Sequence, residues 1–295
     1  MVGFYMHIKL EVSMTSTALS EKAALAKDDR ILLQTRLVLI VVVPVLILAF
    51  LILYIFPDQY GDRFAWKIQP HMTSLLIGSG YLGGAYMFVF AIFGRRFHRV
   101  TAAFPPVTSF TIAMLLATFL HWDRFDLTHF PFQLWLILYI VTPFLIPYLW
   151  IKNRPTDPGT PEPDDLAVPS FAKWGFLLFG IAAMLWAVIM FLFPQFAIDI
   201  WPWKLSPLTA RVLGGWFSLL GIGGLFTSRD PRWSAWRIPL QSITLWAMLV
   251  LVGVFMNPGD FAGGVWNSFT IGTGISIVML VLFQVWMETQ RKRSM

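Results

Sequence analysis

The sequence predicts an all-α integral membrane protein with eight transmembrane helices, arranged as two tandem, parallel four-helix repeats. Three observations lead to this fold class. Hydrophobic residues make up 57% of the chain and charged residues only 13%, against about 25% charged residues in an average soluble domain. Eight stretches are long and apolar enough to cross a bilayer. A long segment of the first half also recurs in the second half.

The repeated segment covers residues 56–84 and returns without a gap at residues 193–221. Ten positions are identical at a constant offset of 137: Phe56/Phe193, Pro57/Pro194, Asp62/Asp199, Trp66/Trp203, Lys67/Lys204, Pro70/Pro207, Leu76/Leu213, Gly78/Gly215, Leu82/Leu219 and Gly84/Gly221. Composition alone does not produce such a match, so the chain is interpreted as an internal duplication.

Residues 1–35 are polar and are predicted to form a cytoplasmic segment, with a short helix from Ser20 to Lys27. They are not a cleavable signal peptide, because the apolar run begins only after Arg36 and lacks a small-residue cleavage site. The sequence leaves open whether translation starts at Met1 or Met14.

The predicted spans share a length of roughly 20 mostly apolar residues. They cover residues 37–56, 72–94, 105–121, 131–151, 172–193, 207–227, 236–256 and 265–287. Residues 36–151 thus form the first repeat and residues 172–288 the second, followed by a basic tail at 289–295.

Between the two repeats, residues 152–171 contain five prolines and four acidic residues. This composition buries too little apolar area to fold on its own, so we expect an extended cytoplasmic linker. Because four spans precede the linker, both repeats insert the same way up, and the predicted pseudo-two-fold axis runs along the membrane normal.

The distribution of Lys and Arg predicts the orientation. The N-terminal segment, the loops after spans two, four and six, and the C-terminus hold 17 of the 22 basic residues. Both termini are therefore predicted to be cytoplasmic. The basic clusters at 95–99 and 291–293 are interpreted as topology anchors that contact anionic lipid, and no nucleic-acid partner is predicted.

The repeated outer loop carries the first candidate site, since each copy places an acid and a Trp-Lys pair before a proline. Proline is favoured at the start of a helix, so Pro70 and Pro207 are expected to begin spans two and six. Two interpretations remain for the remainder of the loop. Either the Trp-Lys pairs anchor it at the headgroups, which we favour, or the charged side chains form an anion-binding vestibule. The residues concerned are Asp62, Trp66, Lys67, Asp199, Trp203 and Lys204.

Glycines concentrate in spans two and six. Small residues let transmembrane helices approach closely, so we expect these two spans to pack against each other at the repeat interface; a ligand groove is the alternative. The residues are Gly78, Gly80, Gly83, Gly84, Gly214, Gly215, Gly221, Gly223 and Gly224.

The last span of each half contains a threonine before a helix-weakening residue. At an offset of 131, Trp135 matches Trp266, and Thr142-Pro143 matches Thr273-Gly274. Paired interruptions of this kind mark mid-membrane binding sites in transporter folds. The alternative is a simple kink, in which each threonine bonds back to its own helix.

Histidines and acids at the outer end of the first half are weak candidates for a metal site. They are His71, His121, His129, Asp123 and Asp126. Imidazole and carboxylate are suitable zinc ligands, but their spacing matches no known signature. No cofactor is predicted, and the absence of cysteine excludes thiolate chemistry.

Charge is nearly absent from the predicted spans. No Asp, Glu, Lys or His lies near the middle of any of them, which disfavours a proton-coupled or cation-coupled carrier. Arg211, about one turn into span six, is the exception. We expect its side chain to extend to the outer surface or to reach Asp199 or Asp260.

The phrase WPWKLSPLTARVLGGWFSLLG at residues 201–221 resembles a phrase found in multi-pass membrane proteins of actinobacteria and related bacteria. Members of that group have no assigned activity. The resemblance implies a bacterial membrane and supports the duplication, and it transfers no functional residue.

Three functions remain open. The preferred one is a non-enzymatic protein that holds or passes an uncharged or lipid-like molecule at the interface of the two repeats. The second is a structural or accessory subunit of a larger membrane complex, and a homo-oligomer is compatible with either. The third is a metal- or haem-dependent membrane enzyme that uses the outer histidines.

Overall fold

The computed structural model describes residues 27–60 and 64–294, and within them eight helices are long and apolar enough to cross a membrane. They are α2 (Leu33–Phe50), α4 (His71–Phe93), α5 (Phe104–Leu120), α6 (Phe130–Asn153), α7 (Ser170–Leu192), α9 (Pro207–Thr227), α10 (Trp233–Met256) and α11 (Ser268–Ser294). The predictions of an all-α fold and of eight candidate membrane spans are confirmed.

Shorter elements extend or connect these helices. A π-helical turn at Leu51–Ile55 continues α2, and 3-10 turns occupy Thr101–Ala103, Trp122–Arg124, Arg154–Thr156 and Pro258–Asp260. The short helices α3 (Pro57–Tyr60) and α8 (Pro194–Ile200) each follow the first helix of their half. They lie at the end of the bundle opposite the C-terminus, which we name the outer end, and we name the end that carries the C-terminus the inner end. The predicted N-terminal segment falls mostly outside the described residues, as do Met14 and Asp62.

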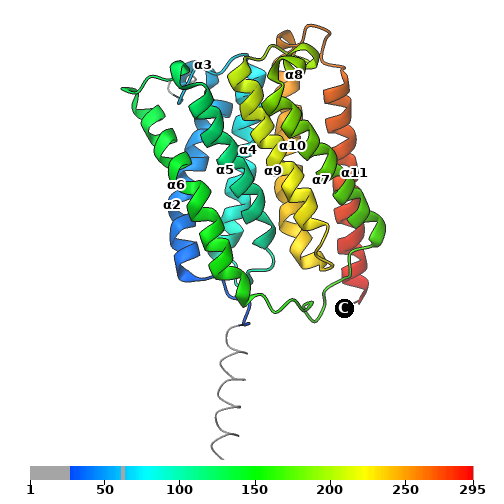
Figure 1. Cartoon of the computed structure of the whole chain (residues 1–295). Helices are drawn as coiled ribbons and strands as arrows, with labels where there is room; N and C mark the ends of the chain where they lie inside the picture. The colour runs from blue at the N-terminus through cyan, green and yellow to red at the C-terminus, as the bar shows by residue number, and fades with distance from the viewer. Residues whose placement is uncertain (1–26, 61–63, 295) are drawn as a thin grey trace, which may run out of the picture.

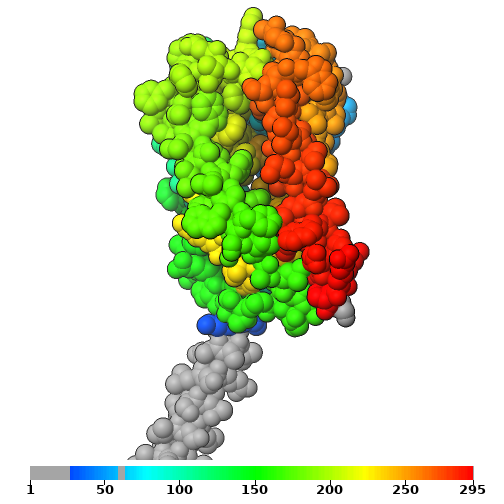
Figure 2. Space-filling view, turned by 90° about the vertical axis from the view of Figure 1, so that its right-hand side faces the viewer, coloured from blue at the N-terminus to red at the C-terminus, as the bar shows by residue number. Residues whose placement is uncertain are grey.

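The eight helices form two layers of four. One layer has the order α6, α5, α9, α7 and the other has the order α2, α4, α10, α11 (Figure 1). Each layer therefore contains two helices from each half, and the halves join where α5 packs on α9 and where α4 packs on α10. Figure 2 shows α7 and α11 side by side at one edge, with a hollow between them at mid-height.

The glycines bring neighbours within one layer together. A Cβ added at Gly224 would lie 2.8 Å from the Phe176 carbonyl oxygen of α7, and one at Gly78 would lie 3.0 Å from Leu53 Cβ. The expected packing of spans two and six against each other is wrong at these two positions, because Gly78 and Gly224 face the preceding span instead. Among the glycines of α4, a side chain of α9 comes close at Gly80, with Trp216 Cζ3 2.6 Å from the added Cβ.

Residues 157–169, between the helices of the two halves, contain no helix and are docked on the inner end of the bundle. Asp157 forms two hydrogen bonds with Arg232, and Glu162 forms two with Arg99. The backbone N–H of Val168 donates to Pro231. The acidic residues that make the segment too polar to fold alone therefore hold it against the basic loops.

Candidate functional site

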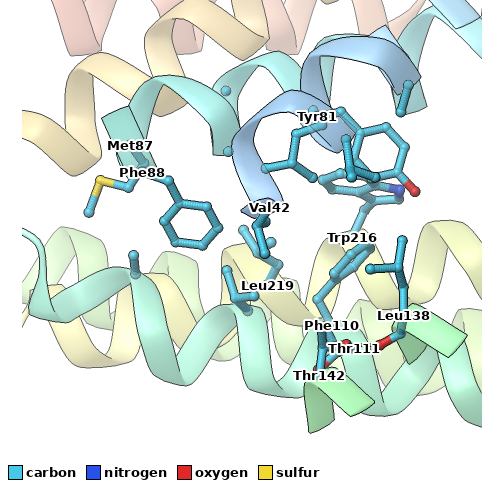
Figure 3. Close-up of a pocket in the computed structure, with 18 of the residues that line it drawn as sticks. Val42, Tyr81, Met87, Phe88, Phe110, Thr111, Leu138, Thr142, Trp216 and Leu219 are labelled. Carbon is cyan, nitrogen blue, oxygen red and sulfur yellow. Dashed lines mark hydrogen bonds between the residues drawn. The ribbon is translucent and has the colours of Figure 1, made fainter. Parts of the chain in front are cut away.

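A cavity of about 290 Å³ lies between α2 and α6 in the first half. Its inner walls come from α4 and α5, and residues of α9 and α10 complete it. Figure 3 shows Tyr81, Trp216 and Phe110 together at one end, with Met87 and Phe88 at the other. No Asp, Glu, Lys, Arg or His is among the residues that line it.

The cavity opens between α2 and α6. Leu48 of α2 and Phe130 of α6 line it and remain 51% and 71% exposed. At the inner end, by contrast, Asn153 ties the two helices together. Its Oδ1 accepts from Leu32 N at 2.9 Å and from Thr35 Oγ1 at 3.0 Å, and it is fully buried. The opening therefore lies toward the bilayer in the outer part of the bundle.

Thr142 lines this cavity, but Thr273 does not. The Thr142 hydroxyl donates to Leu138 O at 2.6 Å, and the Thr273 hydroxyl donates to Phe269 O at 2.7 Å. Both threonines therefore bond back to their own helix. The structure does not bring these two predicted site residues together.

Two tyrosine hydroxyls in the cavity wall are hydrogen-bonded to each other. Tyr81 of α4 and Tyr139 of α6 are 5% and 6% exposed, and their hydroxyl oxygens lie 3.1 Å apart. The ring of Trp216 packs on Tyr81 with centroids 5.3 Å apart. Among the described residues, Trp216 Nε1 has no hydrogen-bond partner.

Trp66 and Trp203 are core residues, so the prediction that they anchor the loop at the headgroups is wrong. They are 8% and 3% exposed, because each outer loop folds inward over the helix ends. Trp66 packs on Phe64, Phe125 and Trp135, and Trp203 packs in the same way on Trp201, Phe261 and Phe269. Lys67 and Lys204, next along the chain, are exposed.

The last span of each half contributes a ring to these clusters. The ring centroid of Trp135 lies 5.6 Å from that of Phe64 and 4.9 Å from that of Trp66. The ring centroid of Phe269 lies 5.7 Å from that of Trp201 and 5.1 Å from that of Trp203. Trp266, by contrast, is 74% exposed.

Arg211 connects three helices at the outer end. Its Nε donates to Phe191 O of α7 at 3.0 Å, and its Nη1 lies 2.7 Å from His121 Nε2 at the end of α5. Burial, followed by the charge of Arg211, lowers the pKa of His121, so the neutral imidazole accepts this bond. The expected contacts with Asp199 and Asp260 do not form. Asp260 instead accepts from Met72 N at 2.7 Å.

The outer histidines and acids have separate partners. His71 Nε2 lies 2.9 Å from Asp58, and His129 Nε2 lies 3.1 Å from the Phe64 carbonyl oxygen. Asp123 pairs with Arg124. Asp126 bonds Thr128, and Asp199 bonds Gln195. Within the described ranges, no three His, Asp or Glu side chains gather in a way that could hold a metal ion.

At the inner end, Asp29, His98, Ser234 and Asp165 form a chain of contacts that we call the polar joint. His98 Nδ1 contacts Asp29 Oδ2 at 2.5 Å, and His98 Nε2 lies 2.8 Å from Ser234 Oγ. Ser234 Oγ contacts Asp165 Oδ2 at 2.5 Å. His98 Nε2 also lies 3.1 Å from Glu162. The joint therefore connects both halves and the segment between them.

Asp29, His98 and Ser234 have the order of a hydrolase triad, but the direction of the hydrogen bonds differs. A hydroxyl has one proton, and the short contact directs the proton of Ser234 to Asp165. The Ser234 hydroxyl is therefore not directed to give its proton to His98, so the joint is assigned to structure. The sequence analysis missed it, although its signal is present: Asp29 precedes His98 by 69 residues and Asp165 precedes Ser234 by 69.

Two carboxyl groups near the joint are held ionised. Burial raises the pKa of Glu162, but the hydrogen bonds from Arg99 outweigh it and leave that pKa below its usual range. Burial and Arg232 act on Asp157 in the same way. The segment between the halves is thus fixed by ion pairs.

Comparisons of the chain with protein-family models, with curated proteins and with solved structures found no match.

Proposed function

We propose that this chain is a multi-pass protein of a bacterial plasma membrane that holds or passes an uncharged, lipid-like molecule in the cavity between α2 and α6. The observation that carries the proposal is the absence of Asp, Glu, Lys, Arg and His from the lining of a cavity that opens sideways between two helices. An isolated charge is costly to bury in such surroundings, whereas an apolar chain is stabilised there.

The mouth of the cavity is built from helices that bend readily. Pro44 lies inside α2, and Pro143 and Pro147 lie inside α6. Proline removes a backbone hydrogen bond and kinks a helix. We propose that the outer parts of these two helices separate to admit the molecule from the bilayer, while Asn153 keeps their inner ends together.

We also propose that the two halves are parallel repeats with both termini cytoplasmic. The clustering of Lys and Arg at the end of the bundle that carries the C-terminus supports the orientation. Equivalent contacts support the repeat. An isolated backbone β-bridge joins Arg30 to Arg96, and a second one joins Ala167 to Arg232. The ring of Trp66 packs on Trp135 as the ring of Trp203 packs on Phe269. We propose that the cavity lies at the interface of the repeats, which the α9 and α10 residues in its wall support.

Cavity-filling variants test the function. A Cβ added at Gly84 or Gly223 has its nearest neighbour at 3.6 Å, so Gly84→Phe and Gly223→Phe extend a ring into the cavity. The matched control is Gly175→Phe on α7, where nothing lies within 4 Å. The measurement is the amount of lipid that remains with the full chain purified in mild detergent, determined by extraction and mass spectrometry.

We expect a specifically retained lipid in the wild type and in the control, and its loss in both filling variants. Retention of the same lipid by correctly folded Gly84→Phe and Gly223→Phe proteins contradicts the proposal. The other two functions have weaker support. The exposed apolar surface of α11 is compatible with an accessory subunit but equally with lipid, and the outer histidines of the enzyme hypothesis lie apart, each with its own partner.

A further inference from the structure

We infer that the molecule in the cavity is a carbonyl-bearing neutral lipid, held through a carbonyl oxygen by the hydroxyl pair of Tyr81 and Tyr139. This inference rests on the proposed function, because it names the chemical class that the same cavity recognises. The evidence for it is which hydrogen-bond donors along the cavity wall already have an acceptor and which do not.

Most hydroxyls in the wall are already committed as donors. Thr111 donates to Thr108 O at 3.0 Å, Thr142 to Leu138 O at 2.6 Å and Ser242 to Gly83 O at 2.7 Å. Each of these side chains satisfies a backbone carbonyl of its own or a neighbouring helix. They add little to recognition of a bound molecule.

The tyrosine pair differs, because two hydroxyls share a single hydrogen bond. Each has one proton, and whichever tyrosine donates to the other leaves the second proton without an acceptor. Among the described residues no other partner for either hydroxyl is found. A buried donor without an acceptor is costly, about 1–3 kcal/mol, so an acceptor atom from the bound molecule would stabilise the site.

A second donor without a partner lies beside this pair. Trp216 is 4% exposed, lines the cavity and packs on the Tyr81 ring, and no described residue accepts from its Nε1. Two uncommitted donors in one aromatic end of the cavity favour a bound group that only accepts. With no cation in the wall to pair an anion, that group is an uncharged carbonyl.

Two kinds of lipid offer this chemistry: an isoprenoid quinone, with ring carbonyls, and a diacylglycerol, with ester carbonyls. The test measures the affinity of the purified full chain in nanodiscs for three probes: an isoprenoid quinone, a diacylglycerol and squalene, a hydrocarbon without oxygen. The decisive variant is Tyr81→Phe/Tyr139→Phe, which keeps both rings. The matched control is Tyr54→Phe/Tyr86→Phe, which removes two hydroxyls that bond Leu249 O and Gln241 outside the cavity.

In the wild type we expect at least one carbonyl probe to bind about five-fold more tightly than squalene, which corresponds to one neutral hydrogen bond. The Tyr81→Phe/Tyr139→Phe variant should lose this difference by weakening the carbonyl probe alone, and the control should retain it. Whichever carbonyl probe binds identifies the source of the lipid.

Equal affinity for squalene and both carbonyl probes in the wild type overturns the inference and leaves the proposed function intact. The inference is also overturned if the folded Tyr81→Phe/Tyr139→Phe variant keeps its full preference for a carbonyl probe. It is overturned as well if Thr227→Val, which removes the remaining hydroxyl in the wall, loses that preference. If the wild type binds none of the three probes, the proposed function fails as well.

Discussion

His98 Nε2 lies 2.8 Å from Ser234 Oγ, and each of these residues follows an aspartate by 69 positions. The backbone N–H of each donates to a carboxylate at 2.9 Å, from His98 to Asp29 and from Ser234 to Asp165. One half uses an imidazole and the other a hydroxyl, and the two side chains meet each other. A contact between equivalent positions is what a pseudo-two-fold axis through the polar joint would produce.

The joint should be sensitive to the loss of His98. In His98→Ala the Asp29 carboxylate, which is 4% exposed, loses the imidazole and keeps the bond from the backbone N–H of residue 98. A buried hydrogen-bonding group left without its partner costs about 1–3 kcal/mol. His98→Ser retains a hydroxyl donor and should cost less. Thermal unfolding of the full chain in detergent compares the two. Equal melting temperatures for both variants would show that the imidazole contributes volume alone.

Acid should release the segment between the halves. The pKa values of Glu162 and Asp157 are lowered in the folded protein, so their ion pairs contribute stability at neutral pH. That contribution is lost as the pH falls below the ordinary carboxyl range and through the lowered pKa values. Limited proteolysis of residues 152–171 should accelerate as the pH falls below the ordinary carboxyl pKa of about 4 and through the lowered values. The Glu162→Gln/Asp157→Asn variant should already be cleaved rapidly at pH 7.

The contact between Arg211 and His121 should give a separate response near neutral pH. The pKa of His121 is lowered in the folded protein, so the unfolded chain binds the proton more readily. Stability from this contact is therefore complete above the ordinary histidine pKa of about 6.5 and falls as the pH drops through the lowered value. His121→Gln retains an acceptor without titrating, so it should flatten the melting temperature between pH 7 and pH 5. An unchanged slope would assign the response to another group.

We expect the hydroxyl of Thr73 to stabilise the folded protein. Its Oγ1 accepts from Trp203 Nε1 at 2.8 Å. Thr73→Val keeps the shape but leaves a buried indole donor unpaired, which costs about 1–3 kcal/mol. Thr289→Val, at an exposed threonine of α11, is the control and should be neutral. Equal melting temperatures for the two variants would show that the bond to Trp203 adds nothing measurable.

Hydropathy was sufficient for the eight helices, because a bilayer requires long apolar segments whatever their neighbours. The cavity could not be predicted in this way, since it depends on how far α2 and α6 separate. The positions of Trp66 and Trp203 were also misjudged. An interfacial tryptophan and one that turns inward have the same place in the sequence, and only the folding of the loop distinguishes them.

The last span of each half shows a different limit. Identical letters matched Trp135 with Trp266, whereas it is Phe269 that makes ring contacts like those of Trp135, because such a packing position requires an aromatic ring and not one residue type. The polar joint was missed for the same reason. His98 and Ser234 share a role without sharing a side chain, and only the repeated spacing from an aspartate connects them.

The hydrogen bonds of Asn153 limit which leaflet of the membrane the cavity can reach. It holds α2 and α6 together at the inner end, and Leu48 and Phe130 border the opening farther out. In the proposed orientation, a molecule that enters or leaves sideways therefore exchanges with the outer leaflet only. A lipid made on the cytoplasmic side must cross the bilayer by another route before it reaches this protein.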